Sequence, residues 1–354
     1  MTSIIIGTGS YLPELEIKNA FFSDSTFFES DGTKVQKLNE TIIEKFSEIT
    51  GIQARRYAPS NYLASDLGYF AAREAIGNAS IDKETLDYII VAHNFGDVEH
   101  KSNRVSIVPS LASKIKALLQ VRNPDCVAYD LPFGCPGWIE GVIQANYYIS
   151  SGDAKRCLVI GTETLSRVID RHDRDSMIFS DGAGAIVLEN TSDHSRGILS
   201  HKTQTHALDH AMLLSMGRSN NPAAENFPDL FLKMNGRKVY EFALNHVPLV
   251  IREALDKANV HLRDIRKILV HQANEKMDTA IAERLFKLYE LKMPEDIMPM
   301  TIGFLGNSSV ATVPTLLDSL LKGRLENHKI VKGDMVVFAS VGAGMNINAL
   351  IYKF

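Results

Sequence analysis

Residues 73–91 read REAIGNASIDKETLDYIIV, and residues 252–270 read REALDKANVHLRDIRKILV. The two stretches align without a gap at an offset of 179 residues, and six of the 19 positions are identical. Each stretch is typical of a helix followed by a buried strand. Because the offset is about half of the 354-residue chain, the pattern predicts one α/β fold of two similar halves. The alternative is chance, or two unrelated helix–strand units whose sequences are alike because they form the same elements. A site is then expected between the halves, where corresponding strand ends converge.

Short apolar runs elsewhere in the chain extend this prediction. Helical spacing of apolar residues occurs at 63–71 and at 244–255, where Pro248 is expected to kink or break the helix. Strands that alternate with helices predict a mixed or parallel sheet covered by helices, and we place the halves at residues 1–175 and 176–354. The expected strands are residues 3–6, 88–91, 126–131, 157–160, 185–188, 267–270 and 335–339.

The composition narrows the class of function. The chain is 45% hydrophobic and 23% charged with a formal net charge of −4, which is typical of a globular protein and unlike a general nucleic-acid binder. Three cysteines are too few for a disulfide scaffold in a chain of this length, and they indicate a reducing compartment. Neither a signal peptide nor an apolar run of about 18 residues is present, so we expect a cytoplasmic protein without a membrane span.

A candidate nucleophile, Cys135, lies in the sequence DLPFGCPGW at residues 130–138. An apolar strand precedes it, and a helical pattern follows from residue 139. Pro136 suits the first position of a helix, so Cys135 is expected at the N-cap. There the helix dipole would stabilise a thiolate, and the free amides of the first turn could face an oxyanion. The alternative is a small buried residue, which suits Cys126 and Cys157 because each opens an apolar strand.

A catalytic thiol needs a base or a cation nearby, and His271 is the best candidate. It directly follows the strand at 267–270 and opens the sequence HQAN, so it stands at a strand's carboxyl end, where α/β sheets place ligands. The alternative is a structural histidine with satisfied hydrogen bonds. His93 holds the matching position in the first half to within one residue, and no second motif surrounds it.

Two glycine-containing segments complete the candidate site. Asn307 lies in GNSS at residues 306–309, where the preceding glycine predicts a tight turn that presents the amide, although turn chemistry alone also explains an asparagine there. The sequence VGAG at 341–344 follows a strand and could bring a backbone amide close to a substrate carbonyl. It matches no nucleotide-binding motif, and neither does SDGAGA at 180–185.

Together these segments resemble the β-ketoacyl-acyl-carrier-protein synthase III family of thiolase-like condensing enzymes. The resemblance covers nearly the whole chain and implies a five-layered α/β/α/β/α fold made of two duplicated halves. The segments that carry it are GTGSYLPE at 7–14, TGIQARR at 50–56, the elbow around Cys135, SGDAKRCLVIGTETLSR at 151–167, FSDGAGAIVLE at 179–189, HQAN at 271–274, GNSS at 306–309 and VGAG at 341–344.

The resemblance implies a decarboxylative Claisen condensation. Cys135 would accept an acyl group as a thioester, and His271 and Asn307 would hydrogen-bond the carbonyl of a malonyl- or β-ketoacyl-thioester on acyl carrier protein. No cofactor or metal is expected, since the coenzyme A and phosphopantetheine thioesters are substrates. Asn307 replaces the second His of elongating synthases, and the C-terminal segment lacks the second Cys of thiolases. The expected oxyanion-hole amides are those of Cys135, Gly342, Ala343 and Gly344, with Ala343 where the family commonly has Gly.

The resemblance also implies partners and further contacts. Asn274 and Arg174 are expected to bind substrate, and Lys276 and Arg284 are expected to dock an acidic acyl carrier protein, with a solvated helix face as the alternative. A homodimer is implied by resemblance alone.

Departures from the family leave the primer open. Lys45 and Ile49 stand where members commonly carry a Trp and an Arg that hold coenzyme A, and the loop at 94–106 is longer than usual. A non-acetyl primer in secondary-lipid or polyketide chemistry is therefore an alternative to priming of fatty-acid synthesis. An acyltransferase without decarboxylation and a catalytically silent subunit are further alternatives.

Overall fold

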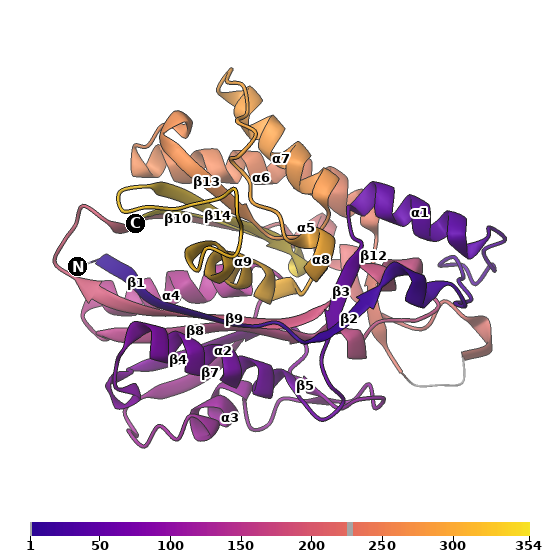
Figure 1. The fold of residues 1–354 in the computed structure, drawn as a ribbon, viewed down its shortest axis with the longest axis horizontal. Coiled ribbons are helices and arrows are strands. Elements are labelled where there is room, and N and C mark those ends of the chain that lie inside the picture. The colour runs from indigo at the N-terminus through magenta and orange to yellow at the C-terminus, as the bar shows by residue number, and fades with distance from the viewer. Residues whose placement is uncertain (1, 225–228) are drawn as a thin grey trace.

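In the computed structural model, which describes residues 2–224 and 229–354, the chain forms two main β-sheets with helices between and outside them (Figure 1). The first sheet has the strand order β1-β9-β8-β4-β7, and the second has the order β10-β15-β14-β13. Their bounds are β1 Thr2–Tyr11, β4 Tyr88–His93, β7 Val127–Pro132, β8 Arg156–Thr164, β9 Asp181–Thr191, β10 Gly197–Thr205, β13 Ile265–Val270, β14 Met335–Gly342 and β15 Asn346–Lys353.

The two sheets repeat one pattern of pairing. Strand β4 runs parallel to β8, and β13 runs parallel to β14. The next strands, β9 and β15, pair antiparallel with β8 and β14, and β1 and β10 follow them antiparallel. Strand β7 extends the first sheet beyond β4. The repeated order confirms the predicted fold of two similar halves.

The aligned stretches of sequence also share their turn. Helix α2 (Ala64–Ala79) is followed by the C-cap residue Ser80, and helix α6 (Gly236–Ala258) is followed by the C-cap residue Asn259. Both C-cap residues have a left-handed backbone with φ of 53°. Two residues later, Asp82 and His261 accept a hydrogen bond from the backbone two positions on and start a 3₁₀ turn into β4 and β13. In both halves a polar side chain therefore accepts a backbone hydrogen bond of the turn.

The helices make three layers around the sheets (Figure 1). Helices α2 and α3 pack on the outer face of the first sheet, and α6 packs on the second sheet with α7 against it. Helices α4 and α9 lie between the sheets, because α4 contacts β8 and β15 while α9 contacts β9 and β13. These contacts give the predicted five layers. The bounds are α3 Leu111–Leu118, α4 Gly137–Ser151, α7 Glu275–Leu288 and α9 Thr312–Leu321.

The hydrophobic core follows the layers and includes the two other cysteines. Cys157 is buried in the cluster between the sheets, and Cys126 is buried in the cluster under α2 and α3. Burial raises the pKa of both thiols. Both cysteines therefore sit as packing residues, as expected for side chains at the start of buried strands.

Pro248 was expected to kink or break its helix; the break is wrong, because α6 runs without interruption from Gly236 to Ala258, and the kink stays a prediction. A proline has no N–H for the carbonyl four residues earlier, which here belongs to Leu244. Arg284 of α7 supplies the missing donor, with Nη1 3.3 Å from the Leu244 carbonyl oxygen. A side chain from the neighbouring helix thus takes the place of the lost helical hydrogen bond.

The change from one sheet to the other lies between Thr191 and Gly197, because β9 pairs within the first sheet and β10 opens the second. The division at residue 175 stays a prediction. Within the two described ranges no helix is long and apolar enough to cross a membrane. The remaining elements are β2 Leu15–Lys18, β3 Ala54–Tyr57, β5 Asp97–Val98, β6 Val105–Ser106, β11 Leu214–Gly217, β12 Phe231–Met234, α1 Asn39–Thr50, α5 Ala207–His210 and α8 Ile302–Leu305.

Candidate active site

Cys135 sits on a sharp turn between β7 and α4. Gly134 has φ of 76°, in the left-handed region that favours glycine. Helix α4 begins at Gly137 with Pro136 as its N-cap, so the predicted N-cap position of Cys135 is wrong and Cys135 lies one residue before the cap. A Cβ on Gly342 would come within 2.7 Å of the Cys135 backbone nitrogen, so the segment at 342–344 packs directly against this turn.

Cys135 is half-buried in the wall of a cavity, and protein atoms surround most of its thiol. Burial raises its pKa to about 11, and the Ser309 hydroxyl, which donates to Sγ over 3.1 Å, acts in the opposite direction. The helix N-terminus also favours the thiolate. Because the pKa is so far above neutrality, the resting group is a thiol that must give its proton to a base when it attacks.

His271 follows β13 and is buried. Burial lowers its pKa to about 4, so the imidazole is neutral near pH 7. Its Nδ1 lies 2.7 Å from Thr312 Oγ1, which also lies 2.9 Å from the Ser309 carbonyl oxygen. The Thr312 hydroxyl has one hydrogen, so its direction sets the tautomer of His271. When Thr312 donates to the Ser309 carbonyl, Nδ1 carries the ring hydrogen and Nε2 is free to accept a proton.

Asn307 is presented by a tight turn, as predicted. Gly306 has φ of 65°, and a Cβ there would lie 2.7 Å from the Cβ of Arg55. The Asn307 backbone is tied to the first half, because its N–H donates to the Ile178 carbonyl over 3.0 Å. Its side-chain Oδ1 accepts a hydrogen bond of 2.8 Å from the Ser309 N–H. That bond leaves the two Nδ2 hydrogens as donors for a ligand.

Cys135, His271 and Asn307 line one cavity of about 410 Å³. The structure thus brings together the three residues that the sequence proposed, two from the second half and one from the first. Backbone from residues 341–344 completes one wall. The rest of the lining is mostly apolar and comes from both halves, and it includes Phe95, Phe133, Leu165, Phe179, Leu214, Met216, Leu232, Met234 and Met277.

A second, wider cavity of about 810 Å³ leads toward the surface. It shares Asn307, Met234 and Met277 with the inner cavity, so the two meet beside the candidate catalytic residues. Lys45 and Ile49, the two departures from the family pattern, lie on its wall. We call the two adjoining cavities together the tunnel, because exposed residues such as Lys45 and Ile49 line the outer cavity and Cys135 lines the inner one.

The predicted substrate and docking residues have mixed surroundings. Arg174 lines the outer cavity but forms an ion pair of 2.7 Å with Glu29. Asn274 also lines it, and its side chain caps α7 by accepting from the Met277 N–H over 3.0 Å. Lys276 is exposed at the start of α7. Arg284 is held against α6 by its bond to Leu244 and by a second donation of 2.8 Å to Asn245 Oδ1. Arg284 is nevertheless exposed, so its role in docking stays a prediction beside this structural contact.

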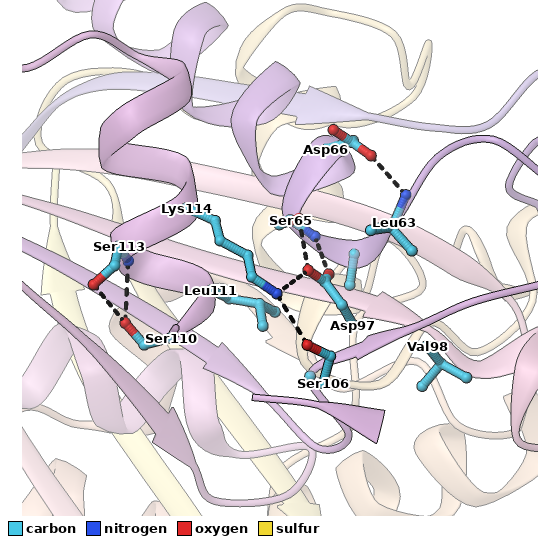
Figure 2. Close-up of polar contacts among 12 residues, drawn as sticks. Leu63, Ser65, Asp66, Asp97, Val98, Ser106, Ser110, Leu111, Ser113 and Lys114 are labelled. Carbon is cyan, nitrogen blue, oxygen red and sulfur yellow. Dashed lines mark hydrogen bonds and ion pairs between the residues drawn. The ribbon is translucent and has the colours of Figure 1, made fainter. Parts of the chain in front are cut away.

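The long loop at 94–106 forms a hairpin that is fixed at its base (Figure 2). The buried carboxylate of Asp97 accepts from the Ser65 N–H over 2.8 Å and from the Ser65 hydroxyl over 2.9 Å. It also forms an ion pair of 2.8 Å with Lys114 of α3. These bonds tie the hairpin to α2 and α3, and they hold Asn94 and Phe95 in the wall of the inner cavity.

The sequence missed four residues that surround the catalytic set, namely Asn94, Glu163, Ser309 and Thr312. Ser309 and Glu163 lie within quoted motifs, but nothing in a linear motif indicates which atoms its side chains reach. Asn94 opens the loop whose length was noticed without a role for its first residue. Only the three-dimensional contacts connect these four to Cys135 and His271.

Comparisons with known proteins agree with this geometry. Residues 129–207 match the 3-oxoacyl-[acyl-carrier-protein] synthase III family model, and residues 255–354 match the model of its C-terminal part. The chain is 32% identical to β-ketoacyl-[acyl-carrier-protein] synthase III 1 of Vibrio vulnificus, with both chains covered in full. The corresponding protein of Vibrio cholerae is 33% identical with the same coverage.

Solved structures give the same result. The synthase III of Thermus thermophilus superposes with a TM-score of 0.80 at 29% identity, over 99% of this chain and 98% of that one. The priming β-ketosynthase of the R1128 polyketide pathway has a TM-score of 0.81 at 25% identity, over 100% and 96% of the two chains. The chain therefore belongs to the 3-oxoacyl-[acyl-carrier-protein] synthase III family of acyl-transferring condensing enzymes.

Proposed function

We propose that this enzyme joins an acyl thioester to a malonyl- or β-ketoacyl-thioester on acyl carrier protein, with loss of the activating carboxylate and through an acyl-Cys135 intermediate. The observation that carries the proposal is the single cavity in which a half-buried thiol, a neutral imidazole and an oriented amide meet. The tunnel formed by the two cavities suits a phosphopantetheine arm that delivers a thioester from the surface.

In the first half-reaction, Cys135 attacks the acyl thioester. The thiol proton passes to Nε2 of His271, while Thr312 donates to the Ser309 carbonyl and Nδ1 holds the other ring hydrogen. The new bond joins Sγ to the acyl carbon, and the bond from that carbon to the departing thiolate breaks. The imidazolium then returns its proton to the departing thiolate. Backbone amides of Cys135 and of the segment containing Gly342, Ala343 and Gly344 stabilise the oxyanion.

In the second half-reaction, the malonyl carboxylate leaves as carbon dioxide and its bonding electrons form an enolate. His271 and Asn307 Nδ2 donate to the enolate oxygen. For this step His271 has exchanged protons with solvent, losing the Nδ1 hydrogen and gaining one on Nε2, and the Thr312 hydroxyl turns to donate to Nδ1. The enolate carbon then attacks the acyl carbon, the bond from that carbon to Sγ breaks, and the Cys135 thiolate takes up a proton from solvent. The reaction uses groups of this chain and of the substrates, with protons from solvent, and we propose no cofactor.

The low pKa of His271 gives a distinct pH profile. An ordinary histidine, with a pKa of about 6.5, is mostly protonated at about pH 5.5 and has lost its power as a base. His271, whose pKa is lowered to about 4, binds a proton only as the pH approaches that value. We expect the single-turnover acylation rate to stay level from about pH 8 to pH 5 and to fall toward pH 4. A fall centred on about pH 6.5 would contradict the neutral base.

A second candidate function is the same chemistry with a non-acetyl primer in secondary-lipid or polyketide synthesis. It is favoured by the apolar wall of the inner cavity and by Lys45 and Ile49 in the outer one. Arg174, which was expected to bind substrate, is also paired with Glu29. The priming ketosynthase of a polyketide pathway is among the structural relatives.

A panel of donors tests both the function and the primer. Acetyl and longer acyl groups are offered on coenzyme A and on acyl carrier protein, and the mass added at Cys135 is measured. We expect a longer acyl group to label faster than acetyl, and carrier-bound donors to lose rate with added salt if Lys276 contributes to docking. Malonyl carrier protein should then release carbon dioxide and clear the adduct. Labelling by acetyl-coenzyme A alone would favour priming of fatty-acid synthesis.

We propose a homodimer in the cytoplasm as the working form. Strand β7 is the edge of the first sheet, and exposed Val105, Ile107 and Val108 lie beside the hairpin that borders the cavity. Such an edge with apolar neighbours is suited to pairing with a second copy. Sedimentation velocity distinguishes this dimer from a monomer of 39.2 kDa.

A further inference from the structure

Ser309 contacts two of the three candidate catalytic residues directly and is connected to the third through Thr312. Its N–H donates to Asn307 Oδ1 over 2.8 Å, and its hydroxyl donates to Cys135 Sγ over 3.1 Å. Its carbonyl accepts from Thr312, the residue that contacts His271. Ser309 also has φ of 52°, a backbone conformation that is uncommon for a residue other than glycine. The strained backbone is held where these contacts converge.

A neighbour fixes the direction of the Ser309 hydroxyl. The amide nitrogen Nδ2 of Asn94 lies 2.8 Å from Ser309 Oγ. An amide NH₂ group only donates, so Oγ must accept this bond, and its own hydrogen remains for Cys135 Sγ. The bond from Asn94 thus aims the hydroxyl hydrogen at the sulfur.

Glu163 in turn fixes the orientation of Asn94. Its carboxyl group is 1% exposed, and Oε2 accepts from the Asn94 backbone N–H over 3.0 Å and from Asn94 Nδ2. Because a carboxylate oxygen accepts, the Asn94 side chain must turn its nitrogen toward it. Nδ2 has two hydrogens, and the second is directed at Ser309. Burial raises the pKa of Glu163 to about 7, yet a protonated carboxyl group still keeps an acceptor oxygen for this bond.

We propose that Ser309 is a further catalytic residue, whose hydroxyl stabilises the negative charge that develops on Cys135 Sγ, and that Asn94 and Glu163 are positioning residues that aim it. The proposal rests on Cys135 as the nucleophile. Charge on a half-buried sulfur is only partly solvated by water, so a donor held in place compensates at the moment of attack. The chain Glu163–Asn94–Ser309–Cys135 crosses between the halves, since Ser309 alone comes from the second.

Alkylation of Cys135 by iodoacetamide tests the hydrogen bond without any substrate. In Ser309→Ala we expect alkylation about 10- to 100-fold slower at a fixed pH between about 7 and 9, because the thiolate fraction falls when a charge-assisted hydrogen bond is lost. Acylation by the best donor should slow by a similar factor. Ser340→Ala is the matched control, since within the described residues the buried Ser340 hydroxyl has no hydrogen-bond partner. The modified cysteine is identified by peptide mass mapping.

Asn94→Asp is a nearly isosteric second variant. An aspartate accepts from the Ser309 hydroxyl and turns its hydrogen away from Sγ, so this variant should slow alkylation like Ser309→Ala. Simple loss of structure exposes the thiol and speeds alkylation, so the direction of change separates the two causes. A wild-type or faster rate in either variant overturns the proposal. Failure of every donor to acylate the wild-type enzyme would instead count against the proposed function, and the alkylation rates would still test the hydrogen bond.

Discussion

Cys135→Ser is expected to form no acyl-enzyme with any donor. The serine hydroxyl is far less acidic and less nucleophilic than a thiol, and it would face the same base. That base is weak, because burial lowers the pKa of His271 to about 4. A loss on the order of 10⁴-fold or more in the acylation rate follows from comparisons of nucleophile deletions. Intact-protein mass after incubation with each donor measures it directly.

The matched control is Cys126→Ala, which removes a thiol from the core under α2 and α3. The substitution should lower stability while the adduct at Cys135 still forms, because Cys126 lies outside the cavity lining. An adduct that persists in Cys135→Ser would place the nucleophile elsewhere. The mapped peptide would then identify the residue.

Asn307→Ala is expected to separate the two half-reactions. Acylation should proceed at close to the normal rate, since the proposed role of Asn307 is to donate to the malonyl oxygen and not to the attacking sulfur. Decarboxylation and condensation should slow by about 10²- to 10³-fold, the usual cost of one oxyanion donor. Single-turnover acylation is followed by mass, and carbon dioxide release is followed from labelled malonyl carrier protein.

A second substitution at the same position sharpens this test. Asn307→Asp keeps the size of the side chain but replaces the donor Nδ2 with an acceptor, so it should block decarboxylation at least as strongly. Asn307→Ala removes the acceptor of the Ser309 N–H, whereas Asn307→Asp keeps an acceptor oxygen for it. Equal loss of acylation and of condensation in both variants would contradict the division of roles between Asn307 and Cys135.

The repeated helix–strand unit and the apolar strands were predictable because each carries a continuous run of buried residues. Strand β15, residues 346–353, was missed because Asn346 and Asn348 interrupt its pattern. Both asparagines are buried, and their amides find partners on distant segments, such as Glu140 Oε2 at 2.8 Å from Asn348 Nδ2. A polar residue satisfied by a distant side chain looks the same in sequence as one facing water.

Pro248 shows the same limit for helices. A local rule predicts a break, and the rule fails because Arg284, 36 positions later, donates to the carbonyl that the proline leaves without a partner. The candidate site divides in a similar way. Cys135, His271 and Asn307 were found because motifs present them, whereas the aim of Ser309 depends on Asn94 and therefore on how the two halves meet.

The proposed nucleophile comes from the first half, and its proposed base and amide come from the second. In this proposal neither half alone contains the full catalytic set, so activity requires the two halves together. Two hydrogen bonds lie at the contact between the halves. One joins the backbones of Asn307 and Ile178, and the other joins the side chains of Ser309 and Cys135. The residues proposed for catalysis therefore also hold the two halves together. If the chain were cut between β9 and β10 and the two fragments mixed, recovered turnover would report their correct reassociation.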